Sequence, residues 1–482
     1  MCTGGVLCRR TAKFLSLISA GQFHFRYLHT PPTLSPLPRS RLGLSSFLRS
    51  SPRTGKHAVT LSRLLNTTTV SGSERRSDDG NAKSTDLPVF NPKKVAVLTK
   101  MTRYDYEKRL HCYWTEEELE SYLTERGSDY AGLKRMHDAH HGKVREVINA
   151  LRERGIEVRL VERFQYTPSL IKWADAIITA GGDGTYLLGA SKIQTTDIPF
   201  LGVNTDLLRS EGYLCLPRYY SQHFTEALDR LLSGQFKWVY RQRIRITMRG
   251  KHQNDQGIEL HDEPLLSPEH RFCEHIREHE QTYVNVDENQ PDRVLPILAL
   301  NEVFLGESLS ARVSYYEISV DGSPREKQKS SGVTVCTGTG SSSWYFNINH
   351  LHKNSIRKLL QIANEVGDLK IPDDDEGFVK RVTKLYNRHL RFDAGLPQVA
   401  YTVRDPVVNG IFQVSNPHGL AKRVLIKSRM WDAKLVVDGG VSFRFNDGAI
   451  ASLEIFKEDA LRTVDFDDTP AYEADHILDP DL

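Results

Sequence analysis

The sequence predicts a doubly wound parallel α/β domain followed by a β-rich domain with a helical insertion. Two observations support this fold class. Between residues 93 and 235, short apolar runs that suit buried strands alternate with segments of helical periodicity. From residue 236 to 465, most of the chain instead shows strand-like runs, and Asp-Gly pairs mark hairpin turns. With 482 residues, the chain can form two ordinary domains.

The first 75 residues have the composition of a targeting segment. No Asp or Glu occurs between Met1 and Ser73, while Lys and Arg recur among many Ser, Thr and Leu residues. This bias is typical of a mitochondrial transit segment. The alternative is a disordered basic arm without a targeting function. We therefore expect a disordered leader over 1–75, a linker over 76–92, a tail over 466–482 and a protein of the mitochondrial matrix.

Charge, hydropathy and cysteine usage exclude several classes. A formal net charge of +3 is nearly neutral for this length, so nothing indicates a nucleic-acid partner. No apolar run approaches the roughly 20 residues that a membrane-spanning helix needs, so we expect no membrane association. The six cysteines show no CxxC pair and no regular spacing, which favours free thiols over a disulfide framework or a zinc site.

The α/β domain is assigned from its apolar periodicity. The helix predicted for 143–154 has apolar residues at helical spacing, and Thr115 with Glu118 forms a capping-box pattern. Lys100 and Arg103 follow the first strand, at the sheet edge where open α/β folds bind ligands; ordinary solvated charge is the alternative. The strands are predicted at 94–98, 156–161, 174–179 and 199–203, and a closing helix at 221–232.

The β-rich domain begins with an alternating segment, 238–246, that we interpret as one strand. Its second face carries Arg241, Arg243 and Arg245, which could bind phosphate or form a solvated face. The Asp438-Gly439 pair is interpreted purely as a turn. We expect a mobile insertion at 252–292, a helical insertion at 351–390, and strands at 294–304, 314–320, 332–336, 400–403, 424–427, 434–437 and 441–445.

A glycine-rich loop follows the third predicted strand. Gly181, Gly182 and Gly184 surround Asp183, and Thr185 comes next. Glycines at a strand end let backbone N–H groups converge on an anion. An acid would repel a phosphate, so Asp183 suggests general-base or metal chemistry at a transferring phosphoryl group. The alternative is a tight turn in which Asp caps a helix. The loop is neither a G-x-G-x-x-G fingerprint nor a Walker loop.

Two polar clusters stand out in the β-rich half. Asn301 and Glu302 interrupt an apolar run that we interpret as mid-strand, where a buried amide requires partners. The segment 337–344, TGTGSSSW, is a hydroxyl-rich and glycine-rich loop after a strand. It is suited to holding a ribose or a phosphate through hydroxyl and backbone contacts.

Taken in order, these motifs resemble the signature series of NAD kinases. The series comprises GGDGT at 181–185, GVN at 202–204, LNEV at 300–303, YEISVDG at 316–322 and TGTGSSSW at 337–344. The basic leader and the long segment after GVN are most similar to the mitochondrial members of the family in animals. The resemblance covers residues 95–463.

The resemblance implies a phosphofructokinase-like α/β domain packed on an all-β, NAD-binding domain. It implies transfer of the γ-phosphoryl group of ATP, with Mg2+, to the adenosine ribose 2′-hydroxyl of NAD, and a homodimer. Asp183 would be the base, Asn301 would contact the adenine and Glu302 the ribose. The other expected binding residues are Gly182, Gly184, Thr185, Asn204, Thr339, Gly340, Ser341, Ser342, Ser343 and Trp344.

Two departures from the family pattern concern ligand contacts. Ser330-Ser331-Gly332 stands where most relatives have GDG, so the Asp contact of that motif is not carried over. The loop after GVN is longer, and Gly212-Tyr213 matches the usual Gly-Phe. The alternatives are a lipid kinase of the diacylglycerol or sphingosine type, which shares GGDGT, and a catalytically silent dinucleotide sensor.

Overall fold

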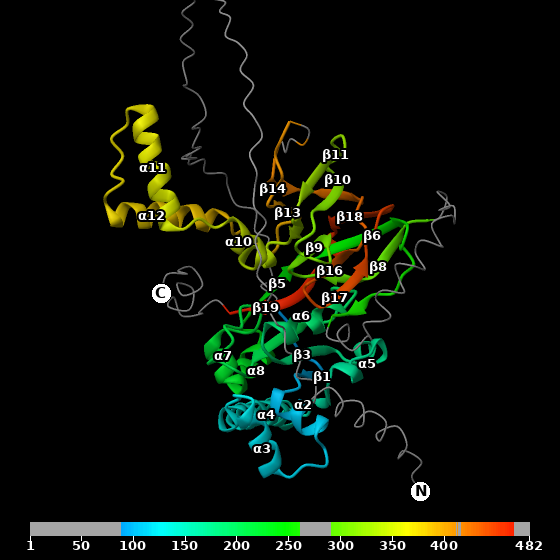
Figure 1. The fold of residues 1–482 in the computed structure, drawn as a ribbon. Coiled ribbons are helices and arrows are strands. Elements are labelled where there is room, and N and C mark those ends of the chain that lie inside the picture. The colour runs from blue at the N-terminus through cyan, green and yellow to red at the C-terminus, as the bar shows by residue number, and fades with distance from the viewer. Residues whose placement is uncertain (1–87, 261–290, 411, 413–415, 467–482) are drawn as a thin grey trace, which may run out of the picture. The chain divides into compact units, whose positions relative to one another are not determined.

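The computed structural model describes residues 88–260, 291–410, 412 and 416–466 (Figure 1). The expected leader at 1–75, most of the linker at 76–92, most of the insertion at 252–292 and nearly all of the tail at 466–482 lie outside the described residues. Within the described ranges, every helix is too short or too polar to cross a bilayer.

The N-terminal region is built on a parallel sheet with the strand order β2-β1-β3-β4. All six residues of β3 are buried, which explains the apolar sequence of this strand. The prediction of a parallel α/β sheet is therefore confirmed. The strands are β1 (Lys94–Thr99), β2 (Glu157–Val161), β3 (Ala176–Gly181) and β4 (Phe200–Asn204).

Helices cover both faces of this sheet. On one face α4 (Tyr130–Glu153) and α8 (Phe224–Leu232) pack against Val95, Ile178 and Leu201. On the other, α5 (Pro168–Trp173) and α6 (Asp183–Ser191) pack against Leu98 and Ile177. The sheet is thus doubly wound, and the 143–154 helix is the second half of α4. The remaining helical elements are α2 (Arg103–Leu110), α3 (Glu116–Glu125), which starts at the predicted capping box, η1 (Arg163–Gln165) and α7 (Arg218–Gln222).

The C-terminal region is a sandwich of two antiparallel sheets around one apolar core. The first sheet has the order β11-β10-β15-β18-β6-β8: β6 (Ile244–Gly250), β8 (Arg293–Ala299), β10 (Ser314–Val320), β11 (Glu326–Ser330), β15 (Arg423–Ser428) and β18 (Ala449–Ile455). The second has the order β14-β13-β12-β9-β16-β17-β7: β7 (Ile258–Glu259), β9 (Glu302–Glu307), β12 (Gly332–Cys336), β13 (Val399–Arg404), β14 (His418–Ala421), β16 (Ala433–Val437) and β17 (Val441–Arg444).

A separate two-stranded ladder joins the last strand to the first domain's core. In it, β19 (Leu461–Asp465) pairs with β5 (Lys237–Arg241), and Val464 packs in the cluster beneath α4 and α8. Between β12 and β13 the chain forms η3 (Thr339–Ser342), α10 (Trp344–Asn349), α11 (Lys353–Gly367) and α12 (Glu376–His389). A short η4 (Lys457–Asp459) precedes β19.

The prediction of one strand over 238–246 is wrong. The chain forms β5 and β6 with a break at Gln242 and Arg243, because the N–H of Gln242 donates to the carbonyl of Ala394 and Arg243 turns inward. Arg243 is fully buried and donates to the carbonyls of Ala190, Ile193 and Asp459. These contacts make Arg243 a structural residue of the α6 C-terminus, so it does not belong to a phosphate-binding face.

Candidate active site

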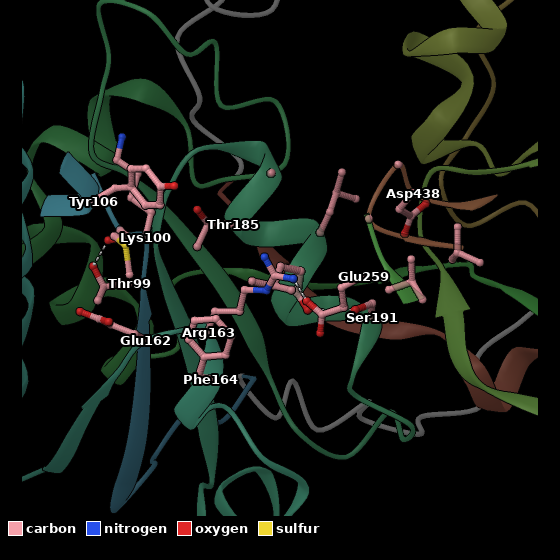
Figure 2. Close-up of a pocket in the computed structure, with 18 of the residues that line it drawn as sticks. Thr99, Lys100, Tyr106, Glu162, Arg163, Phe164, Thr185, Ser191, Glu259 and Asp438 are labelled. Carbon is pink, nitrogen blue, oxygen red and sulfur yellow. Dashed lines mark hydrogen bonds and ion pairs between the residues drawn. The ribbon is translucent and has the colours of Figure 1, made fainter. Parts of the chain in front are cut away.

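A cavity of about 820 Å3 lies at the carboxyl edge of the parallel sheet (Figure 2). One wall comes from the end of β1 and the start of α2, including Lys100 and Arg103. A second comes from α6, and a third from the turn between β16 and β17. The cavity is thus lined by both the α/β region and the β sandwich.

The glycine-rich loop starts α6 directly beside this cavity. Gly182 is the N-cap residue, Asp183 begins the helix, and Gly184 and Thr185 line the cavity. The first N–H groups of a helix have no partner within the helix, and together with the helix dipole they favour a bound anion. This arrangement fits a phosphate group beside Gly184 and Thr185.

The Asp183 carboxylate is held by the loop that follows β4. Its two oxygens accept the backbone N–H groups of Tyr213 at 3.2 Å and Leu214 at 2.9 Å. These bonds fix the direction of the carboxylate, and each oxygen keeps acceptor capacity for a further donor. Asp183 therefore joins α6 to the 205–216 loop, in addition to any role toward a ligand.

Asn204 organises the same loop from its other end. Its side chain is buried, donates to the Ser210 carbonyl at 2.8 Å and accepts the N–H of Asp206 at 3.0 Å. Gly212 has φ of +71°, and a Cβ there would lie 2.5 Å from the Asn204 amide nitrogen. Only glycine fits both constraints. In this structure Asn204 is a loop anchor, and its side chain does not line the cavity.

Asn301 and Glu302 lie at a break between two strands, so the prediction that both are mid-strand is wrong. β8 ends at Ala299 and β9 begins at Glu302. The cause is Asp438, whose carboxylate accepts the N–H groups of Leu300, Asn301 and Glu302 at 2.8, 2.8 and 3.0 Å. A side chain thus replaces a neighbouring strand as the acceptor.

Asp438 is consequently more than the turn residue that the sequence suggested. It does form the turn between β16 and β17, with φ of +47°, and it also lines the cavity opposite Lys100 and Thr185 (Figure 2). The Asp-Gly pattern is typical of hairpins, so the sequence holds no signal for the second role. Sequence reasoning missed this residue.

The two neighbouring carboxyl groups of this segment, Glu302 and Asp438, have different pKa values. Burial raises the pKa of Glu302 to about 8, with the nearby Asp438 charge as the second cause, against a lowering hydrogen bond with Ser343. Burial also raises the pKa of Asp438, to about 6, against the three backbone N–H donors. Because those donors bind the ionised form, Asp438 carries the charge and Glu302 holds the proton near neutral pH.

The 337–344 loop packs directly against Asn301. The N–H of Thr337 donates to the Asn301 carbonyl at 2.9 Å, and a Cβ on Gly340 would lie 2.1 Å from that carbonyl oxygen. Ser341 is buried, donating to the Gly338 carbonyl and accepting the N–H of Phe392. The loop and the Asn301 segment therefore form one packed unit.

Three polar atoms of this unit are buried without a protein partner in the described ranges. They are Asn301 Oδ1, Glu302 Oε2 and Thr339 Oγ1. Buried polar atoms in native proteins are nearly always hydrogen-bonded, so such a group indicates a ligand or water. Ser342 and Trp344 are exposed, and the Trp344 ring meets Phe304 edge to face at 5.3 Å.

The predicted site residues thus fall into two groups. Gly184 and Thr185 line the cavity, whereas Gly182, Asp183, Asn204, Asn301, Glu302 and the 339–344 residues do not. Asp438 connects the groups, since it lines the cavity and binds the Asn301 segment. Lys100 and Arg103 also line the cavity, and Lys100 lies 3.8 Å from Asp206.

Together, the fold and the site define a two-domain protein whose α/β part presents a helix N-terminus to the cavity and whose β sandwich holds buried polar atoms without a partner in the described ranges. The family model described as ATP-NAD kinase N-terminal domain matches residues 113–236. The chain is 46% identical to the human protein "NAD kinase 2, mitochondrial" over 377 residues, which are 78% of this chain and 84% of that protein. The chain therefore belongs to the NAD kinase family.

Other relatives agree with this assignment. The rat protein of the same name is 46% identical, over 78% of this chain and 88% of that protein. The Xenopus tropicalis protein is 45% identical, over 79% of this chain and 92% of that protein. A solved NAD kinase from Archaeoglobus fulgidus in complex with ATP aligns over 80% of this chain and 98% of that chain, at 15% identity. Its TM-score of 0.45 is too low to define the fold.

Proposed function

We propose that this chain transfers the γ-phosphoryl group of ATP to the adenosine ribose 2′-hydroxyl of NAD, giving NADP, ADP and a proton. The observation that carries the proposal is the link made by Asp438. This residue lines the cavity together with Gly184 and Thr185, and it binds the segment that holds the unpaired Asn301 Oδ1 and Glu302 Oε2. Family membership supports the same reaction.

The unpaired acceptors suit the adenosine half of a dinucleotide. Asn301 Oδ1 would accept from the adenine amino group, and Glu302, once ionised, would accept from ribose hydroxyls. Ser342, Ser343 and Trp344 lie beside this segment and would cover the adenosine. Thr339, Gly340 and Ser341 would shape the pocket from behind, because the loop packs on the Asn301 carbonyl.

The α6 N-terminus would hold phosphate groups. Gly184 would supply a backbone N–H group and Thr185 a hydroxyl, with Gly182 beside them as the N-cap residue, and Lys100 and Arg103 add positive charge to the same cavity. Asp183 would orient the attacking 2′-hydroxyl and take its proton as the bond to phosphorus forms and the bond to ADP breaks. Asn204 would act through the loop that binds Asp183.

Mg2+ fits this lining as an ion that arrives with ATP. The carboxylates of the cavity wall already have protein partners: Glu162 binds Arg109, Glu259 binds Arg163, and Asp438 binds three N–H groups. Mg2+ at nucleotide sites is held mainly by phosphates and water with one or two carboxylates. The ion would neutralise charge on the transferring phosphoryl group.

The test is a coupled assay of NADP formation by the full chain with NAD and Mg-ATP. We expect turnover with NAD and none with diacylglycerol, and Asp183→Asn should lower kcat by roughly 10²- to 10⁴-fold. Thermal stabilisation by NAD without any NADP would show a dinucleotide sensor instead. Near-wild-type turnover of Asp183→Asn would remove Asp183 from the mechanism.

The site of action and the assembly are part of the same proposal. We propose that residues 1–75 direct the protein to the mitochondrial matrix, and that two copies form a homodimer. The relatives named above are called mitochondrial, which supports the address. A fluorescent protein fused after residue 75 should enter the matrix, and light scattering should give twice the mass of one chain.

A further inference from the structure

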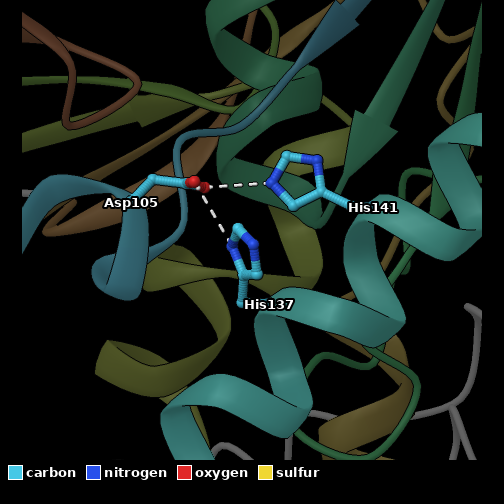
Figure 3. Close-up of side chains that lie close together, drawn as sticks. All are labelled: Asp105, His137 and His141. Atoms are coloured by element: carbon cyan, nitrogen blue, oxygen red, sulfur yellow. Dashed lines mark hydrogen bonds and ion pairs between the residues drawn. The ribbon is translucent and has the colours of Figure 1, made fainter. Parts of the chain in front are cut away.

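Two histidines and one aspartate converge beside the cavity, outside the groups described so far (Figure 3). His137 Nδ1 lies 3.3 Å from Asp105 Oδ1, and His141 Nε2 lies 3.1 Å from Asp105 Oδ2. The three donor atoms all lie within 4.8 Å of one another. No other group of three or more His, Cys, Asp or Glu donors is this close among the described residues.

The local structure explains why these side chains meet. His137 and His141 are four residues apart on α4, so both imidazoles lie on one face of the helix. Asp105 is in the first turn of α2, where Thr102 and Asp105 form a capping box. The helices pack on each other, and the capping box directs the Asp105 carboxylate toward α4.

We propose that Asp105, His137 and His141 bind a zinc ion. Two imidazoles and one carboxylate form a donor set that zinc prefers and that leaves a coordination position for water. Zinc bonds of roughly 2.0–2.2 Å, arranged tetrahedrally, place neighbouring donors about 3.3–3.5 Å apart. The two N···O separations are close to this value but involve different oxygens of Asp105, and all three donor atoms lie within 4.8 Å of one another. Side-chain rotations that close this spacing would complete the donor set.

The surroundings provide support and access. The Thr102 hydroxyl donates to Asp105 Oδ2 at 2.6 Å and lies 3.2 Å from His137 Nδ1, so it holds the carboxylate beside the histidine. Hydrogen-bonding partners of metal ligands orient them in this way, and His137 Nδ1 would exchange its Thr102 contact for the ion. The side chain of His141 is 35% exposed and that of His137 21%, so an ion can enter from solvent. The neighbouring His140 does not belong to the site, because its two ring nitrogens contact Thr99 and Thr205 at 2.9 Å.

The competing explanation is a metal-free cluster in which Asp105 accepts from both rings. Burial acts to raise the pKa of Asp105, but the hydrogen bonds from Thr102 and His141 together outweigh it and lower this pKa to about 2, so the carboxylate is ionised in either case. The two explanations differ in what zinc does. A metal site binds zinc with all three residues, whereas a hydrogen-bonded cluster gains nothing from it.

A zinc ion at this position would also stabilise one wall of the cavity. Zinc would fasten α2 to α4, and α2 begins at Arg103, the last residue of the Lys100–Arg103 segment that lines the cavity. The ion would differ from Mg2+, which prefers oxygen ligands and octahedral geometry. The inference does not depend on the kinase reaction, because it concerns the binding of the metal itself.

The experiment measures zinc binding by the full chain after dialysis against a chelator. Zinc alone is titrated in competition with a chromophoric chelator, and Co2+ is used as a spectroscopic substitute. The variants are His137→Gln, His141→Gln and Asp105→Asn. His418→Gln is the matched control, since His418 is an exposed histidine at the start of β14. Because the chain has 18 histidines, the readout is the difference from wild type.

We expect wild type and His418→Gln to bind one more tight equivalent than each of the three variants. The loss of a direct ligand should lower affinity at that site by about 100-fold or more, since losing an outer partner alone costs roughly 10- to 100-fold. Zinc should also raise the melting temperature of wild type and not of His141→Gln. A wild-type chain with no tight zinc, or equal stoichiometry in wild type and His141→Gln, would overturn the proposal.

Discussion

Replacing Asp438 with Asn tests the link between the cavity and the Asn301 segment. Asn tolerates the positive φ of this turn position better than most residues, so the substitution leaves the hairpin unstrained. The changes are then confined to the carboxylate. Oδ1 accepts from Asn301 and Glu302, and Oδ2 accepts from Leu300. An amide offers one oxygen where the carboxylate offers two, so at least one N–H loses its acceptor.

The expected cost follows from these three bonds. An unsatisfied buried N–H costs about 1–3 kcal/mol, and the two remaining bonds change from charged to neutral acceptors, at about 0.5–1 kcal/mol together. The free energy of unfolding should therefore fall by about 1.5–4 kcal/mol. Removing the charge should also lower the pKa of Glu302 from about 8, because Asp438 is one of the two causes of its elevation.

Two measurements check this reasoning. Urea unfolding gives the change in stability, and KM for NAD between about pH 6 and 9 reports the ionisation of Glu302. We expect the wild-type KM to fall as pH rises toward the Glu302 pKa, with the same transition at lower pH in Asp438→Asn. Asp447→Asn, at an exposed hairpin position near Arg429, is the control. Wild-type stability and an unshifted pH profile in Asp438→Asn would refute the reasoning.

Three further substitutions have defined outcomes. Glu302 holds a proton with a raised pKa, so its contribution to stability is complete below about pH 4.5 and is lost as pH rises through about 8. Glu302→Gln should flatten this decline, worth up to about 5 kcal/mol, in urea unfolding at several pH values. Gly212→Ala should lower the melting temperature through about 1–3 kcal/mol of strain against Asn204, whereas Gly410→Ala, at an open position, should not. Arg243→Met should destabilise the chain by about 3–5 kcal/mol, because three carbonyls lose their donor, and an unchanged melting temperature would contradict its structural role.

The parallel sheet was predictable because three of its four strands, β1, β3 and β4, are buried on both sides. Runs such as 95–98 and 176–178, within the predicted strands 94–98 and 174–179, are apolar throughout, and only a sheet covered on both faces requires that. The first half of α4 was not predictable from periodicity. It carries His137, His140 and His141, whose polar contacts replace the apolar stripe that marks the second half.

The candidate site was only partly predictable, for a physical reason. Asp183 and Thr185 are two residues apart in a recognisable glycine-rich loop, so local sequence places them together. Asp438 binds Asn301 from 137 residues away, and no local pattern encodes that contact. Arg243 was misassigned because alternation in sequence does not show where a strand ends. The sequence also does not distinguish a buried arginine from a solvated one.

The error about Asn301 and Glu302 has its own explanation. A continuous strand would pair the N–H groups of 300–302 with a neighbour and would fix every side chain by the pleat. Asp438 satisfies those N–H groups instead, so the backbone leaves the ladder without an unpaired donor. The departure leaves Asn301 Oδ1 and Glu302 Oε2 buried and unpaired. Two polar residues that disfavour a strand are therefore found where the strand is broken, and the carboxylate that breaks it also lines the cavity.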